Sequence, residues 1–233
     1  MRQDDFSKLL PACCRVGFAS IDQYDTDERR AIQTFLPDVR TVIVVAHHVM
    51  HSLEWTWFSF EGEPGGETCP ADLHAKSMSK RIRRMLEAEG HRSLLLPYPG
   101  SCGVMFKTLA AQTGLGQLGD SFLFMNADWG PWIHLRVVLT DAEIEFERRS
   151  APEACTHCGA CRSACPSGAI MEDDFDGLKC RDGMRGLRNS LGKVPYIYEC
   201  ERCLRACPIG PAPHEVLVSY KDRTAGETAV SVP

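Results

Sequence analysis

The sequence lacks any long apolar segment. No window of the 233 residues approaches the roughly 20 consecutive apolar residues that a membrane-spanning helix needs. The N-terminal stretch MRQDDFSKLL is charged and lacks the apolar core of a signal peptide. We therefore expect no membrane span, no export and a cytoplasmic location. The chain also lacks an excess of basic residues: its formal net charge of −5 argues against a broadly basic nucleic-acid-binding surface.

Cysteine, in contrast, is abundant. The chain has 12 cysteines, and without export to an oxidising compartment such thiols typically hold metal instead of forming disulfides. Eight of them lie in or near two runs, CTHCGACRSACP from Cys155 and CERCLRACP from Cys200. The first run has the C-x₂-C-x₂-C-x₃-C-P spacing of bacterial ferredoxins, in which the fourth cysteine ligates the other of two [4Fe–4S] clusters. The spacing therefore predicts two clusters with crossed ligation.

The second run is one cysteine short of a full repeat. Ile197 stands where the missing ligand would be, and Cys180 is the nearest remaining cysteine. We predict one cluster on Cys155, Cys158, Cys161 and Cys207, and the other on Cys165, Cys180, Cys200 and Cys203. Zinc ribbons or a disulfide cluster are the alternatives, but the three-residue gap before each Cys-Pro suits neither. Cys13, Cys14, Cys69 and Cys102 are left over, and we expect buried, inert thiols there.

Helical and strand patterns alternate over residues 1–142. The run from Thr41 to Ala46 is apolar and rich in β-branched residues, so it predicts a buried strand. Residues 72–89 predict a helix that Gly90 ends. Further helices are expected over 26–35, with Thr26 as N-cap, and 104–113, and further strands over 18–21, 93–96, 122–125 and 133–139. We predict an α/β (α+β) domain over 1–146, a double-cluster ferredoxin-like domain over 147–213 and a tail over 214–233.

Gly114, Gly116 and Gly119 satisfy the pattern G-x-G-x-x-G. A dinucleotide-binding fold needs a strand before this motif and a helix after it, and here the expected order is reversed. The bare backbone suits the close approach of a flat or phosphate-bearing cofactor, or only a tight turn.

Polar residues at two other places are candidates for a site. His47, His48 and His51 follow the predicted strand, where ligand sites often form in α/β domains. They could bind a metal or lie over a cofactor, although partly exposed polar residues are commoner at such a place. Asp72 would cap the long helix or donate a proton.

A longer segment resembles a known family. The residues Leu96-Pro-Tyr98-Pro-Gly100, the glycine motif, Asn126, Trp129-Gly130 and Leu139-Thr-Asp141, followed by the eight cysteines, resemble the epoxyqueuosine reductases, relatives of the reductive dehalogenases. The resemblance covers about residues 70–210. It implies a nitroreductase-like domain that binds cobalamin, with the double-cluster module supplying single electrons. The corrinoid would then be lined by Tyr98, Gly100, Gly114, Gly116, Gly119 and Asn126.

The chain departs from that family at two motifs. Gln117-Leu-Gly-Asp120-Ser stands where the family has Trp-Ile-Gly-Lys-Asn. The family has an Asp-Tyr-His motif whose aspartate is the catalytic acid. Asp72-Leu-His74 matches that motif only in part, because a leucine replaces the tyrosine. The proton-donor candidates are Asp72, Tyr98, His47 and His48. Because the chain is acidic and shows no helical-repeat extension, we expect that tRNA is not its substrate.

The resulting hypothesis is an iron–sulfur oxidoreductase. A ferredoxin or flavodoxin would reduce the exposed cluster, and the second cluster would pass electrons to cobalamin for reductive chemistry on a small molecule. The alternatives are an electron-transfer protein or reductive activator of a separate corrinoid protein, an FMN-dependent reductase, and a protein whose clusters are only structural.

Overall fold

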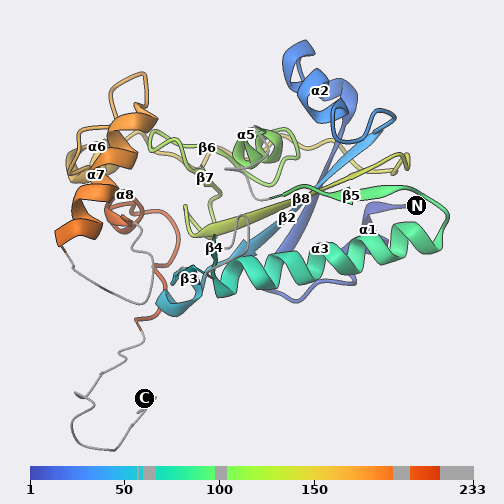
Figure 1. The fold of residues 1–233 in the computed structure, drawn as a ribbon, viewed down its shortest axis with the longest axis horizontal. Coiled ribbons are helices and arrows are strands. Elements are labelled where there is room, and N and C mark those ends of the chain that lie inside the picture. Colours follow the sequence, from blue (N-terminus) through green and yellow to red (C-terminus); the bar gives the residue numbers. More distant parts are fainter. Residues whose placement is uncertain (57, 60–66, 98–103, 191–199, 216–233) are drawn as a thin grey trace, which may run out of the picture.

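The computed structural model describes residues 1–56, 58–59, 67–97, 104–190 and 200–215. Its central element is a four-stranded antiparallel sheet in the order β1–β2–β8–β5 (Figure 1). These strands are β1 (Cys14–Ser20), β2 (Thr41–His48), β8 (Ile133–Thr140) and β5 (Ser93–Leu95). Two small hairpins pair β3 (Phe58–Ser59) with β4 (Glu67–Thr68) and β6 (Gln117–Leu118) with β7 (Phe124–Met125).

Helices cover both faces of the sheet. Helix α3 (Pro70–Ala88) lies along one face, with α1 (Gln3–Ser7) beside it; α2 (Thr26–Gln33) and α5 (Phe106–Ala111) cover the other (Figure 1). The short 3₁₀ helices η1 (Ile21–Gln23) and η2 (Ser52–Trp55) follow β1 and β2. The cysteine-rich part forms α6 (Ala160–Ala164), α7 (Gly177–Ser190) and α8 (Arg202–Arg205) at one end of the sheet. None of the helices in these described ranges is both long enough and apolar enough to cross a membrane.

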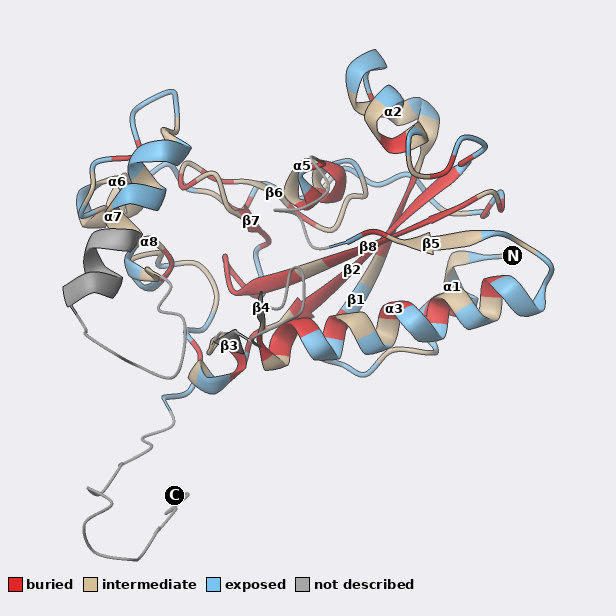
Figure 2. Ribbon diagram, in the orientation of Figure 1, coloured by how far each residue is buried: buried red, intermediate tan, exposed pale blue. Residues whose placement is uncertain are grey.

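Strand β2 shows why its sequence reads as one apolar run. Successive side chains of a strand point to opposite faces. Val42, Val44 and Ala46 therefore join the core beneath α2 and α5, whereas Ile43 and Val45 pack against Ile82 and Leu86 of α3. A strand covered on both sides has no polar face, and Figure 2 shows β2 and β8 as the most continuously buried elements.

The mixed α/β fold class is confirmed, and the differences lie at element ends. The strand expected over 41–46 extends to His48, and the helix expected over 72–89 begins at Pro70. Gly90 follows that helix with φ of +83°, as predicted for its C′ position. The expected helix 104–113 and strand 122–125 shorten to Phe106–Ala111 and Phe124–Met125.

Two predicted N-caps are wrong. The N-cap of α2 is Asp25, whose carboxylate accepts the backbone N–H groups of Asp27 and Glu28 at 2.9 Å. The N-cap position of α3 is Cys69, because Pro70 fits the first helical turn. Asp72 therefore lies inside α3.

The cysteine-rich end is packed onto the sheet through a small apolar cluster. Leu204 of α8 is buried with Val49, Trp132 and Ala71. Gly130 and Gly210 both have positive φ, and their backbones approach so closely that a Cβ at either would overlap the other segment. His214, where a separate tail was expected to begin, bonds its N–H to the carbonyl of Met50 at 2.8 Å. Residues 216–233 lie outside the described residues.

Replacing Gly130 by alanine is expected to loosen this junction. A left-handed conformation costs a non-glycine residue roughly 1–2 kcal/mol, and the new Cβ would also overlap the carbonyl of Ile209. Gly90→Ala is the matched control, because Gly90 has φ of +83° but no atom within 4 Å of such a Cβ. We expect a clearly larger fall in thermal midpoint for Gly130→Ala. Equal falls would show that the close approach carries no energetic weight.

Candidate metal centres and the adjoining cavity

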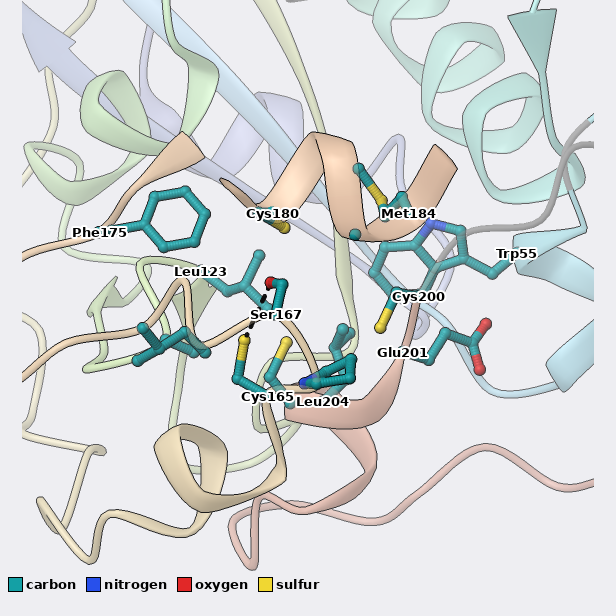
Figure 3. A pocket seen from close by; sticks show the side chains of 15 residues that line it. Trp55, Leu123, Cys165, Ser167, Phe175, Cys180, Met184, Cys200, Glu201 and Leu204 are labelled. Atoms are coloured by element: carbon teal, nitrogen blue, oxygen red, sulfur yellow. Dashed lines mark hydrogen bonds between the residues drawn. The ribbon is translucent and has the colours of Figure 1, made fainter. Parts of the chain in front are cut away.

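Two cavities in the cysteine-rich end are each lined by four cysteines. The inner cysteine cavity, of about 330 Å³, is lined by Cys165, Cys180, Cys200 and Cys203 (Figure 3). The outer cysteine cavity, of about 20 Å³, is lined by Cys155, Cys158, Cys161 and Cys207. These two sets have the same members as the two predicted ligand sets. That these cysteines ligate iron stays a prediction, and four thiols around one cavity are a donor set that suits a [4Fe–4S] cluster.

Short helices bring the cysteines together. Gly159 has φ of +73° and turns the chain into α6, which carries Cys161. Cys165 ends that helix in an extended conformation, as expected for a residue that precedes proline. Its side chain therefore leaves the first set and joins Cys180 of α7 and Cys203 of α8.

Burial and neighbouring thiols raise the pKa values of cysteines in both cavities. Burial raises the pKa of Cys203 to about 12, and the neighbouring Cys200 and Cys180 raise it further. Burial also raises the pKa of Cys207, with Cys155 and Cys158 adding to it. Without a cation such groups keep their protons, so metal binding here would release protons.

Cys165 is the exception among these thiols. Burial would raise its pKa, but the Ser167 hydroxyl and nearby backbone N–H groups outweigh burial and lower it. The N–H of Ala169 lies 3.3 Å from the sulfur atom. The chain thus already supplies hydrogen bonds for a sulfur anion, as cluster ligands require.

A third cavity continues this row into the sheet domain. The front cavity, of about 310 Å³, is lined by Trp55, Met105, Phe106, Lys107, Leu123, Phe124, Pro131, Ile133, His134 and Leu135. It shares Trp55 and Leu123 with the inner cysteine cavity, and Ser121 lines both cysteine cavities. The segment 120–125 thus contributes to all three cavities. The front cavity falls in the common size range of small-molecule sites.

The three glycines of the motif pack against the chain itself. A Cβ at Gly114 would overlap the carbonyl of Arg149, and one at Gly116 that of Met125. One at Gly119 would lie 2.5 Å from the sulfur of Met125 and 3.5 Å from that of Cys155. Close internal packing therefore accounts for the bare backbone, and these glycines give no separate support for a cofactor.

The other predicted cofactor contacts are divided. Tyr98 and Gly100 lie outside the described residues. Asn126 accepts the N–H groups of Asp128 and Trp129 through Oδ1, at 3.1 and 2.8 Å. Its Nδ2 is buried and has no partner among the described residues.

The two adjacent histidines face opposite sides of the sheet. The ring of His48 stacks on Trp129 at 5.1 Å, its Nε2 is buried without a partner in the described ranges, and burial lowers its pKa. His47 lies on the α3 side, fully buried, with Nε2 2.6 Å from Oε2 of Glu54. The third histidine of the group, His51, is exposed.

Asp72 forms the best-paired ionic contact in the described structure. Its Oδ1 lies 2.6 Å from Nε of Arg136 and 2.9 Å from Nε2 of His134, and its Oδ2 lies 2.7 Å from a second guanidinium nitrogen. Burial alone would raise the pKa of Asp72, but the hydrogen bonds from His134 and Arg136 hold it well below its usual range. Asp72 therefore accepts these hydrogen bonds as a carboxylate, and its role as a proton donor stays a prediction.

Sequence reasoning missed Arg136 and His134. The signal available was two charged or titratable residues in the run IHLRVVLT, which otherwise reads as a buried strand. A buried charge requires a partner, but the partner lies 64 residues away from Arg136 along the chain.

Comparison with known proteins places these features in context. Residues 151–171 match a family described as a 4Fe-4S binding domain. The epoxyqueuosine reductase of Gloeobacter violaceus is 27% identical over 212 residues, which are 82% of this chain and 63% of that protein. That of Synechococcus sp. is 29% identical over 189 residues, 77% of this chain and 58% of that protein.

Solved structures share the fold. Epoxyqueuosine reductase from Streptococcus thermophilus superposes with a TM-score of 0.65 at 19% identity, over 90% of this chain and 66% of that one. The catabolic reductive dehalogenase NpRdhA superposes with a TM-score of 0.54 at 16% identity, over 83% of this chain and 29% of that one. The chain is thus similar to epoxyqueuosine reductases in sequence and in fold. This confirms the resemblance found in its sequence, and the 4Fe-4S match identifies an iron–sulfur-binding segment.

The chain covers only part of the length of these relatives. This epoxyqueuosine reductase-like chain spans 63% of the length of the Gloeobacter protein, so activity does not transfer with the fold. One similar structure is an epoxyqueuosine reductase with a modified tRNA stem loop, at 17% identity and a TM-score of 0.63. Another, at 16% identity and a TM-score of 0.53, is a reductive dehalogenase structure that suggests a mechanism for B12-dependent dehalogenation. None of the proteins named here is described as a flavoprotein.

Proposed function

We propose that this chain is an iron–sulfur oxidoreductase that passes electrons through two [4Fe–4S] clusters to an acceptor in the front cavity. The main support for this proposal is that three neighbouring cavities share lining residues. Ser121 lines both cysteine cavities, and Trp55 and Leu123 line both the inner cysteine cavity and the front cavity. When bound, each cluster supplies one-electron transfer.

Exposure sets the direction of electron flow in this proposal. Cys158 in the outer set is exposed, whereas Cys203 in the inner set is more deeply covered. A ferredoxin or flavodoxin would therefore dock at the outer set. The apolar side chains of Trp55, Leu123 and Leu204 line the inner cysteine cavity, and the surroundings of a cluster are one of the means by which a protein adjusts its potential.

We propose cobalamin as the acceptor. Support comes from the likeness to a dehalogenase structure linked to B12-dependent chemistry; the buried unpaired atoms of Asn126 and His48 lie outside the lining of the front cavity. The glycine motif offers no cradle, so no chemical step is assigned through the corrinoid. The chain's own contribution is a cavity wall with two polar groups, Lys107 and His134, and an ionised Asp72 that holds His134 in place.

A separate corrinoid protein and a modified tRNA are the alternatives to bound cobalamin. A separate corrinoid protein would make the chain a reductive activator, and the internal packing of the three glycines favours this rival. A modified tRNA is bound by a similar epoxyqueuosine reductase structure, which weakens the expectation that tRNA is not a substrate. The FMN alternative has no support from the relatives named above.

The test is to purify the full chain anaerobically, reduce it and add cobalamin. We expect about eight irons per chain, tight binding of cobalamin, and oxidation of the clusters when it is added. Iron without cobalamin binding, but with electron transfer to a corrinoid protein, would replace the proposed acceptor with the first rival. A protein without iron would overturn the proposal.

Trp55→Ala is expected to slow transfer from the clusters to the added acceptor several-fold, because it removes the wall shared by the inner cysteine cavity and the front cavity. Rapid-mixing absorbance measurements would follow the clusters. Leu53→Ala is the control: Leu53 lies in the same helix η2 but is 41% exposed and lines neither cavity. Equal rates in both variants would exclude Trp55 from the path.

A further inference from the structure

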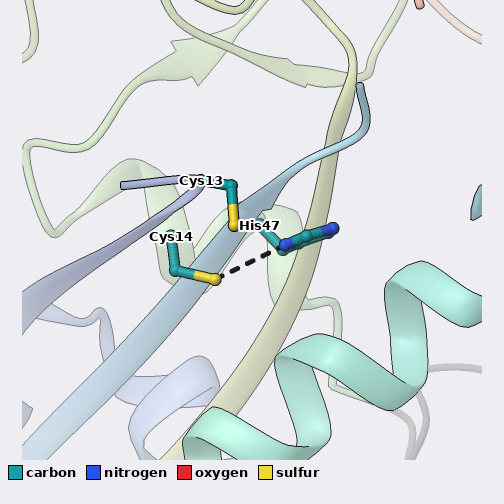
Figure 4. Close-up of side chains that lie close together, drawn as sticks. All are labelled: Cys13, Cys14 and His47. Carbon is teal, nitrogen blue, oxygen red and sulfur yellow. Dashed lines mark hydrogen bonds between the residues drawn. The ribbon is translucent and has the colours of Figure 1, made fainter. Parts of the chain in front are cut away.

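A second group of sulfur and nitrogen ligands lies away from the cysteine cavities, on the α3 side of the sheet. Cys14 in β1 and His47 in β2 are direct partners across the two strands. Cys13, just before β1, places its sulfur beside them (Figure 4). The two thiols and one imidazole nitrogen all lie within 4.8 Å of one another. Cys13 and Cys14 were expected to be inert thiols, and the structure places both beside a histidine.

The spacing suits one tetrahedral ion. Zn–S bonds of about 2.3 Å and Zn–N bonds of about 2.0–2.1 Å place neighbouring ligand atoms about 3.5–3.8 Å apart. Nδ1 of His47 lies 3.4 Å from Sγ of Cys14. The side chains therefore need only small adjustments to share a cation.

Glu54 prepares His47 for this role. Burial would raise the pKa of Glu54, but its hydrogen bond and charge interaction with His47 lower it, so Glu54 is ionised. A carboxylate only accepts hydrogen bonds, so Nε2 of His47 carries the proton toward Glu54 at 2.6 Å. In the neutral imidazole, Nδ1 then has a lone pair on the side of the Cys14 thiol. A carboxylate behind a histidine ligand is the usual arrangement in metal sites.

We propose that Cys13, Cys14 and His47 bind a zinc ion, with Glu54 orienting the imidazole and the fourth coordination position open. Two thiolates and an imidazole select a soft or borderline cation and disfavour Mg²⁺ or Ca²⁺. Three protein ligands with an open fourth position are the pattern of catalytic and not of structural zinc. The exposed His74, whose ring centroid is 5.2 Å from that of His47, flanks the group.

A simple hydrogen bond from the Cys14 thiol to His47 is the competing explanation. Burial and the neighbouring Cys13 raise the pKa of Cys14 to about 12, so without a cation the Cys14 thiol keeps its proton. A metal ion binds cysteine as the thiolate and would displace that proton. The two explanations therefore differ in the absorption spectrum with a metal that reports thiolate ligation.

The test titrates Co²⁺ into the full, anaerobically purified chain with its iron in place. We expect one Co²⁺ per chain, an intense thiolate-to-cobalt absorption band, and displacement by Zn²⁺. Cys14→Ser and His47→Ala should abolish this band. Cys69→Ala, which changes another buried cysteine outside the group, should retain it.

Glu54→Gln separates positioning from ligation. It should keep the thiolate band and weaken Co²⁺ binding by about 10–100-fold, as is typical when such a carboxylate partner is lost. Circular dichroism would verify that each variant is folded. Absence of Co²⁺ binding in the unsubstituted chain, or a band that persists in folded Cys14→Ser, would overturn the proposal.

Discussion

Replacing Cys180 by serine is expected to remove one cluster and spare the other. The iron content of the anaerobically purified protein should fall from about eight to about four per chain. The reason is geometric: Cys180 of α7 reaches the inner cysteine cavity beside Cys165, Cys200 and Cys203, and it is absent from the outer set. Iron analysis and electron paramagnetic resonance of the reduced protein would measure the loss.

Two further variants frame this result. Cys158→Ser should remove the outer cluster instead, so the two single variants should each keep the signal that the other loses. Cys69→Ala should keep all the iron, because Cys69 lines neither cysteine cavity. Full iron content in Cys180→Ser would show that Cys180 is not a ligand and that another residue completes the inner set.

Arg136→Met is expected to lower the free energy of unfolding by about 3–5 kcal/mol, the usual cost of removing one partner of a buried ion pair. The side chains of Asp72 and Arg136 are only 3% and 6% exposed. Removing the guanidinium therefore leaves a carboxylate in a poorly solvated place. Urea unfolding followed by circular dichroism would measure the change.

An exposed ion pair supplies the control. Arg40 and Glu143 are 61% and 77% exposed, so Arg40→Met should cost less than about 1 kcal/mol. The double variant Asp72→Leu with Arg136→Met should recover much of the lost stability, because no uncompensated charge remains. A loss in Arg136→Met no larger than in Arg40→Met would contradict the assigned role.

The buried Asp72 and its neighbour His134 also predict that the stability of the fold depends on pH. The pKa of Asp72 is lowered in the folded state, so its contribution is fully present above the unfolded value of about 4 and is lost as the pH falls further. Burial lowers the pKa of His134, so the unfolded chain takes up protons first, and stability also falls as the pH drops below about 6.5. Urea midpoints at pH 7, 5.5 and 4 should decrease in that order.

Local pattern determined much of this protein from the sequence alone. The run from Thr41 to Ala46 predicts a buried strand, and Gly90 predicts the end of a helix, because both signals depend on neighbours within a few residues. The cysteine spacing also divides seven thiols, with Cys180 added by its nearness in the sequence, into the two sets that the structure brings together. Three intervening residues and a proline are enough to turn Cys165 away from Cys161.

Tertiary structure decided which residues, distant from one another in the sequence, come into contact. Asp72 reads as a helix cap in the sequence, but the antiparallel pairing of β2 with β8 and the packing of α3 across them place Arg136 and His134 beneath it. Cys14 and His47 meet only because β1 and β2 pair in one register. The glycine motif is compatible in the sequence with a cofactor loop or a tight turn, and only the structure shows that it packs against Arg149 and Met125. Sequence patterns act over a turn or a strand, whereas register and layer packing join residues dozens of positions apart.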